Sequence, residues 1–142
     1  MKIGVIVFGM TENLQPLRDL ALRHGRTGTT LTPIPRFEIG VGQASSGTSP
    51  CLYRSMICFI LQGSKEVAIH DELLRYDASQ YLVSALDLPL SGQIHDADGG
   101  SPYVAVSLVL DPALLAEVAS TMPAVRDADT PDSGIAINLM TP

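Results

Sequence analysis

The feature that most constrains this fold is a series of short apolar segments between residues 37 and 110, separated by turn-forming residues. In residues 37–42, apolar side chains alternate with polar residues or glycines, which is the period of a β-strand. Further strand-like segments are 51–54, 56–62, 66–70, 73–76, 80–85, 92–95 and 103–110. A parallel sheet needs a crossover helix between its strands, and none is indicated here. We therefore expect an antiparallel β-sandwich or barrel.

Two turn-rich stretches define how the first of these strands connect. Residues 26–36 are rich in Gly, Thr and Pro and are predicted to form a loop. The Gly63–Ser64 pair is predicted to start a hairpin that joins residues 56–62 to residues 66–70.

A helix is expected on each side of the β region. Residues 11–25 place leucines on one face; Thr11 is positioned to cap the start, and Gly25 to end it in a left-handed conformation. Asp111 and Pro112 are a strong N-cap and first-turn pair for a second helix. Its apolar residues are Leu114, Leu115 and Val118, and Pro123 is expected to end it.

Composition favours a single globular domain. The chain has 142 residues, of which 46% are hydrophobic and 17% charged, so it is long enough and apolar enough to bury a core. Its formal net charge is −6, with nine Lys and Arg residues. Nucleic-acid and anionic-membrane surfaces require clustered basic residues, so we expect neither partner for this chain itself.

The cysteines and the N-terminal segment indicate a cytoplasmic setting. Cys51 and Cys58 are too few for a disulfide framework and lie in apolar segments, where a thiol usually behaves as a small hydrophobic group. The apolar run in residues 1–9 is shorter than a signal peptide or membrane span requires. We interpret residues 1–10 as a vector-derived or mis-called segment, residues 11–123 as the domain and residues 124–142 as a linker.

A family resemblance rests on residues 50–65. The pattern is Pro50-Cys51, Tyr53, Cys58 and Gln62-Gly63 followed by Lys65. Supporting pieces, in the same order along the chain, are 32–35, 81–84, 87–89, 102–103, 111–118, 134–135 and 141–142. Together they resemble the effector-sensing N-terminal domain of AraC-type bacterial transcription regulators.

The resemblance implies a mainly β fold with a few helices, built as an antiparallel cupin-like β-barrel or jelly roll with an N-terminal and a C-terminal helix. It also implies a small-molecule effector, DNA contact only through a C-terminal domain missing from this chain, and a homodimer of the full-length protein. No cofactor is implied.

Candidate ligand-binding residues are the polar or polarisable side chains within apolar strands, because a buried polar group needs a hydrogen-bond partner and a ligand can supply one. They are Tyr53, Cys58, Phe59, Gln62, Tyr81 and Ser84, with Ser107 as a further polar exception. This mixture favours an uncharged or weakly polar ligand, including an aromatic one. An inward-pointing Arg54 would instead indicate an anion.

Two alternatives remain open at the level of sequence. A stand-alone cupin-like metalloenzyme, such as an isomerase or dioxygenase, would use His70, Asp71, Glu72 and His95 as metal ligands. However, the chain has no His-x-His motif, and solvated turn residues account for these side chains better. We therefore predict no metal and no catalytic residue. The other alternative is a structural module whose own side chains fill the barrel.

Overall fold

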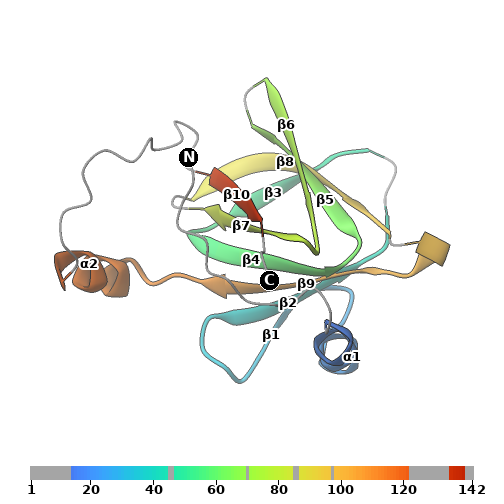
Figure 1. Cartoon of the computed structure of the whole chain (residues 1–142), viewed down its shortest axis with the longest axis horizontal. Helices are drawn as coiled ribbons and strands as arrows, with labels where there is room; N and C mark the ends of the chain where they lie inside the picture. The colour runs from blue at the N-terminus through green and yellow to red at the C-terminus, as the bar shows by residue number, and fades with distance from the viewer. Residues whose placement is uncertain are drawn as a thin grey trace.

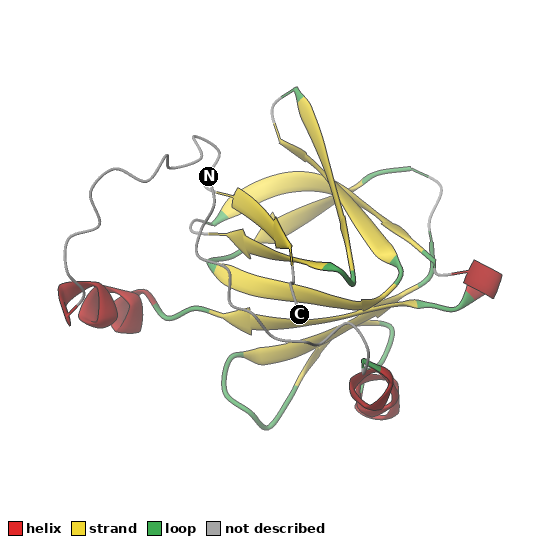
Figure 2. Cartoon of the chain, viewed as in Figure 1, coloured by secondary structure: helices red, strands yellow, loops and turns green. Residues whose placement is uncertain are grey.

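The computed structural model describes residues 14–44, 47–69, 71–84, 87–96, 98–121 and 135–139. Two antiparallel sheets face one another; helix α1 (Gln15–His24) lies against one of them, and helix α2 (Pro112–Thr121) follows the last long strand (Figure 1). The expected mainly β fold with an N-terminal and a C-terminal helix is confirmed, and it consists of two sheets (Figure 2).

The larger sheet has six strands in the order β1-β2-β9-β4-β7-β10, and the smaller has four in the order β3-β8-β5-β6. The six strands are β1 (Gly28–Leu31), β2 (Phe37–Gly42), β9 (Tyr103–Val109), β4 (Met56–Gln62), β7 (Gln80–Ser84) and β10 (Ile135–Leu139). The four are β3 (Ser49–Tyr53), β8 (Leu88–His95), β5 (Ser64–Ile69) and β6 (Glu72–Asp77). A short 3-10 turn, η1 (Asp98–Gly100), precedes β9.

The predicted hairpin at Gly63–Ser64 is wrong, because β4 and β5 belong to different sheets. Gly63 has φ +82°, the left-handed region that favours glycine. An added Cβ there would also collide with the carbonyl oxygen of His95. The turn therefore passes the chain from one sheet to the other, and β5 pairs instead with β6 and β8.

The predicted loop at 26–36 is also corrected, since β1 forms within it and pairs antiparallel with β2. The connection between the two strands is held by Thr32, whose hydroxyl donates to the Phe37 carbonyl oxygen at 2.8 Å. Arg36 has φ +63°, and this left-handed residue turns the chain into β2.

Helix α1 differs in detail from the prediction. It begins at Gln15, with Leu14 at the N-cap and no side-chain capping bond, while Thr11 lies outside the described residues. Gly25 is extended, with φ −84° and ψ 151°, and does not form a left-handed stop. Glycine is required there for close packing, because an added Cβ would lie 2.7 Å from both the Ala21 carbonyl oxygen and Ile39 Cγ2.

The sheets carry two apolar layers. One lies between α1 and the larger sheet and contains Leu14, Ala21, Ile39, Leu61 and Val104. The other lies between the sheets and contains Tyr53, Cys58, Ile60, Val67, Ile69, Tyr76, Leu82, Tyr103 and Ala105. Successive side chains of a strand point to opposite faces, so β2 and β9 each contribute one set of residues to α1 and the other set to the space between the sheets.

In the part of the chain that the structure describes, neither helix has the length and apolar character needed to cross a membrane.

Candidate functional site

A cavity of about 340 Å³ lies between the two sheets. The larger sheet contributes Glu38, Gly40, Met56, Cys58, Tyr103, Ala105 and Ser107, and the smaller sheet contributes Cys51, Tyr53, Lys65 and Ile94. Arg54, directly after β3, also lines it. The cavity wall therefore combines apolar groups, hydroxyls and thiols with three charged side chains, of which Glu38 is negative and Arg54 and Lys65 are positive.

Small residues on β2 and β9 leave this space open. Gly40 and Ala105 face each other in the β2–β9 register. A Cβ added at Gly40 would find nothing nearer than the Ala105 carbonyl oxygen at 3.9 Å, so a side chain at this position would extend into open space. Along β2, Ile39 thus packs into the apolar layer that contains residues of α1, while Gly40 leaves the cavity open.

A hydrogen-bonded row of buried side chains connects the sheets beside the cavity. The hydroxyls of Tyr53 and Tyr76 are 3.0 Å apart, and the Tyr76 hydroxyl donates to Cys58 Sγ at 3.7 Å. Each phenol can donate in the bond between the two hydroxyls, because a phenolic oxygen both donates and accepts. Burial is the main cause that raises the pKa values of Tyr53, Tyr76 and Tyr103, so all three are neutral phenols at physiological pH.

The two cysteines have the character expected of core thiols. Cys58 is buried, and Cys51 is half-buried in the opposite wall. Burial raises the pKa of Cys51, with a smaller opposing effect of Lys65, and this disfavours the reactive thiolate.

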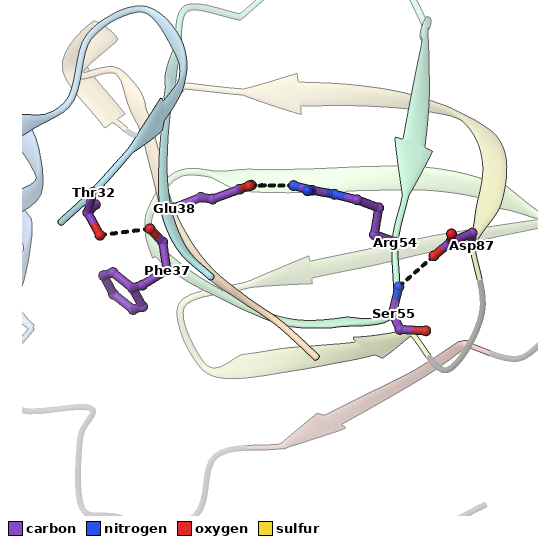
Figure 3. Close-up of polar contacts among 6 residues, drawn as sticks. All are labelled: Thr32, Phe37, Glu38, Arg54, Ser55 and Asp87. Atoms are coloured by element: carbon purple, nitrogen blue, oxygen red, sulfur yellow. Dashed lines mark hydrogen bonds and ion pairs between the residues drawn. The ribbon is translucent and has the colours of Figure 1, made fainter. Parts of the chain in front are cut away.

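Glu38 and Arg54 form an ion pair at the cavity wall (Figure 3). Arg54 Nη2 donates to both carboxylate oxygens of Glu38, at 2.5 and 2.6 Å. The Glu38 side chain is only 10% exposed and that of Arg54 is 43% exposed, so the carboxylate lies inside and the guanidinium extends towards solvent. Next along the chain, the Ser55 amide donates to Asp87 Oδ1 at 3.0 Å and fixes the turn after Arg54 (Figure 3).

Lys65 lies on the cavity face of β5. It shares this face with the buried Val67 and Ile69, because residues two apart on a strand point the same way. Its ammonium nitrogen is 4.8 Å from the centre of the Tyr53 ring, a cation–π distance. Burial favours the neutral amine, but interactions with Tyr53, Cys51 and Cys58 together outweigh that effect and raise the pKa of Lys65.

The structure brings together two of the six predicted ligand-binding residues, Tyr53 and Cys58, at the cavity. The rings of Phe59 and Tyr81 lie on neighbouring strands with their centres 5.7 Å apart and their planes tilted by 32°, and neither residue lines the cavity. Gln62 donates to the Pro102 carbonyl oxygen at 2.8 Å, and Ser84 is fully buried away from the cavity wall. Whether any of these residues binds a ligand stays a prediction.

The sequence also singled out Arg54 and Ser107, which do line the cavity, but it did not point to Glu38, Lys65 and Tyr103 as lining residues. The position of Lys65 could have been predicted from the sequence. It lies two residues before Val67 and four before Ile69, so it is on the same face of the strand as these apolar residues.

For the metalloenzyme alternative, the described residues contain no group of three His, Cys, Asp or Glu side chains placed to hold a metal ion. His70 lies outside the described residues. His95 Nε2 lies 3.4 Å from Glu66 Oε1, which also faces Arg75, in an outward ion-pair network away from the cavity.

Residues 33–142 match the family described as the N-terminus of AraC-type transcriptional regulators. This match covers most of the chain, so the chain belongs to that family and is the ligand-sensing regulatory domain of an AraC-type regulator. The match does not favour the stand-alone metalloenzyme.

Among solved structures, the chain is similar to apo ToxT from Vibrio cholerae, with 11% identity and a TM-score of 0.48. The similarity covers 81% of this chain and 44% of the ToxT chain, so this chain spans less than half of that structure. No curated protein sequence matches the chain.

Proposed function

We propose that the cavity between the sheets is the effector site of this regulatory domain, and that DNA is contacted by a C-terminal domain outside this chain. The observation that carries the proposal is the cavity of about 340 Å³, which falls within the range of small-molecule sites. Gly40 leaves open space on the β2 side of the cavity. Polar side chains from the smaller sheet and from β9 line the rest of the same space. The net charge of −6 supports assigning DNA contact to another domain.

A route from the cavity to the C-terminal side of the domain begins at the Glu38–Arg54 pair. Arg36, two residues before Glu38, has its guanidinium 3.6 Å from Asp111, the N-cap of α2. The last two backbone amides before Asp111 donate to the carbonyl oxygens of Arg36 and Ser55, at 2.8 and 2.7 Å. An effector that displaces Glu38 or Arg54 therefore acts on the two segments that hold the start of α2. To regulate, the effector must bind more tightly to one arrangement of these segments than to the other.

The full-length protein is proposed to be a homodimer. Helix α2 has no buried residue, and it exposes Leu114, Leu115 and Val118. This apolar surface is available for a contact with the same helix of a second copy. Such a contact would explain why these side chains are not buried against the sheets of their own chain.

The effector site is tested by filling the cavity. Gly40→Leu places a side chain in open space on a strand, so we expect it to fold, with an unfolding free energy within about 1 kcal/mol of the wild type. A library of small fragments, neutral and charged, is screened against both proteins by ligand-observed NMR and thermal shift. We expect fragments that bind the wild type to lose binding to Gly40→Leu.

The matched control is Ala113→Leu, which adds bulk on the exposed surface of α2 and should leave fragment binding unchanged. Fragments that bind Gly40→Leu as tightly as the wild type would show that the cavity is not the effector site.

A further inference from the structure

We propose that the effector of this domain carries a carboxylate and that Lys65 is the residue that binds it. This inference rests on the proposed function of the cavity and adds the chemical class of its ligand. A carboxylate ligand differs from the uncharged or weakly polar ligand that the sequence favoured.

The first step is the position of Lys65. Its stem runs within the wall between β8 and β6, where it is opposite Ile94 and Tyr76 in the strand register. Gly92 leaves space for the stem, because a Cβ there would lie 3.3 Å from Lys65 Cε. Lys65 is therefore built into the cavity wall and is not a surface lysine folded over the opening.

The second step is the charge balance. Among the described residues, no carboxylate lies within the 4.0 Å ion-pair limit of the Lys65 ammonium group. The carboxylate of the cavity, Glu38, is already held by Arg54. Glu38, Arg54 and Lys65 together leave one positive charge in excess inside a chain whose net charge is −6. The Lys65 ammonium group thus has no anionic partner among the described residues, and a ligand carboxylate would supply one.

The third step is the protonation state. Burial favours the neutral amine, but the pKa of Lys65 is raised overall above its ordinary value of 10.5, so the amine is protonated at neutral pH. It is thus a hydrogen-bond donor and a positive charge, and it is not a nucleophile that would form an imine with a carbonyl compound.

The fourth step is size. An apolar cavity of about 150 Å³ holds one benzene molecule, so about 340 Å³ accommodates an aromatic or short aliphatic acid. Met56, Ile94 and Ala105 supply apolar contacts for the body of such a ligand. We expect its carboxylate near Lys65 and its body along these side chains.

The experiment compares two isosteric probes, benzoate and benzamide, by isothermal titration calorimetry at neutral pH and fixed ionic strength. For the wild-type chain we expect benzoate to bind about tenfold to a hundredfold more tightly than benzamide, the value of a charge-assisted hydrogen bond. Lys65→Met keeps the apolar stem and should abolish this preference, whereas Lys65→Arg should retain most of it. Arg75→Gln removes the same charge from the outward face of the same sheet and should leave both affinities unchanged.

The outcomes separate the two proposals. Equal affinities for benzoate and benzamide in the wild type, unchanged benzoate affinity in Lys65→Met, or no saturable benzoate binding would each overturn the carboxylate inference. If benzamide binds as well as benzoate and Gly40→Leu abolishes both, the cavity is an effector site for neutral ligands. If both probes bind and Gly40→Leu weakens neither, the cavity is not the effector site and the proposed function fails with the inference.

Discussion

Glu38 is a charged residue at a position where an ordinary antiparallel sandwich has an apolar one. It occupies a core-facing position of β2, where its carboxylate is paired with Arg54 and only 10% of its side chain is exposed. A charged side chain between two sheets is usually replaced by an apolar one unless the site needs it. Its neighbours Gly40 and Gly42 also line the cavity, so this face of β2 borders open space and not a packed core.

Breaking this pair should destabilise the fold. Arg54→Met leaves the Glu38 carboxylate largely buried without its partner, and we expect the free energy of unfolding to fall by about 1–3 kcal/mol. The loss should be smaller than for a fully buried pair, because the Arg54 side chain is partly exposed. Water can therefore reach the Glu38 carboxylate once the guanidinium is removed. Urea denaturation at neutral pH measures the change.

The matched variant is the double substitution Glu38→Gln and Arg54→Met, which removes the buried charge together with its partner. It should recover part of the lost stability. Strictly additive effects in this double-mutant cycle would show that the pair contributes nothing beyond its separate residues.

At the level of the element, α2 is a helix whose beginning the sequence predicted correctly. The Ala113 amide donates to Asp111 Oδ1 at 2.8 Å, as an N-cap requires. The expected apolar face, however, packs on nothing within the described residues, because Leu114, Leu115 and Val118 are exposed. Figure 1 shows the helix to the side of the two sheets. Its stability therefore depends on local interactions.

Removing the cap should affect α2 and leave the sheets unchanged. We expect Asp111→Ala to cost about 1 kcal/mol of helix stability, which corresponds to roughly fivefold faster amide exchange across Pro112–Thr121. Hydrogen-exchange mass spectrometry measures this change and compares it with exchange in β4 and β9.

Asp111→Asn separates the two roles of this side chain, since asparagine keeps the capping oxygen and loses the ion pair with Arg36. Exchange in α2 should remain near the wild-type rate in this variant. A similar acceleration in both variants would mean that the contact with Arg36, and not the cap, holds the helix.

For the whole molecule, the row of Tyr53, Tyr76 and Cys58 joins the two sheets, since Cys58 belongs to the larger sheet and the phenols to the smaller. Burial raises the pKa values of both phenols, so the folded state keeps them neutral where the unfolded chain ionises them. Their contribution is fully present below the ordinary pKa of 10.0 and is lost as pH rises through the higher folded-state values.

We therefore expect the free energy of unfolding to decline from about pH 10 upwards, as measured by urea denaturation across that range. Tyr76→Phe should show a smaller decline, together with a loss of about 1 kcal/mol at neutral pH from the missing hydrogen bonds. The tyrosinate absorbance contributed by Tyr53, Tyr76 and Tyr103 should rise only as the protein unfolds. Ionisation of all the tyrosines in the intact fold would contradict this view of the core.

The local chemistry of the chain made several elements predictable. Alternation identified β2, the short apolar segment at residues 103–110 identified β9, and the Asp-Pro pair identified the start of α2. Strand β1 was missed because its short, polar run of Gly28–Leu31 has no apolar period, and it is a strand only through pairing with β2. The hairpin at Gly63 was mispredicted because a glycine turn fixes the direction of the chain but not the sheet that the next strand joins.

By itself, the sequence determined the mainly antiparallel β architecture, its flanking helices and its family, because these depend on periodicity, turn chemistry and local motifs. Only the tertiary structure decided which face of each strand surrounds the cavity. Alternation divides a strand into two faces, but it does not state which face meets α1 and which meets the second sheet. Tyr53 and Cys58 were candidates from the sequence and line the cavity, while Lys65 and Glu38 were recognised as lining it only once the two sheets were seen together.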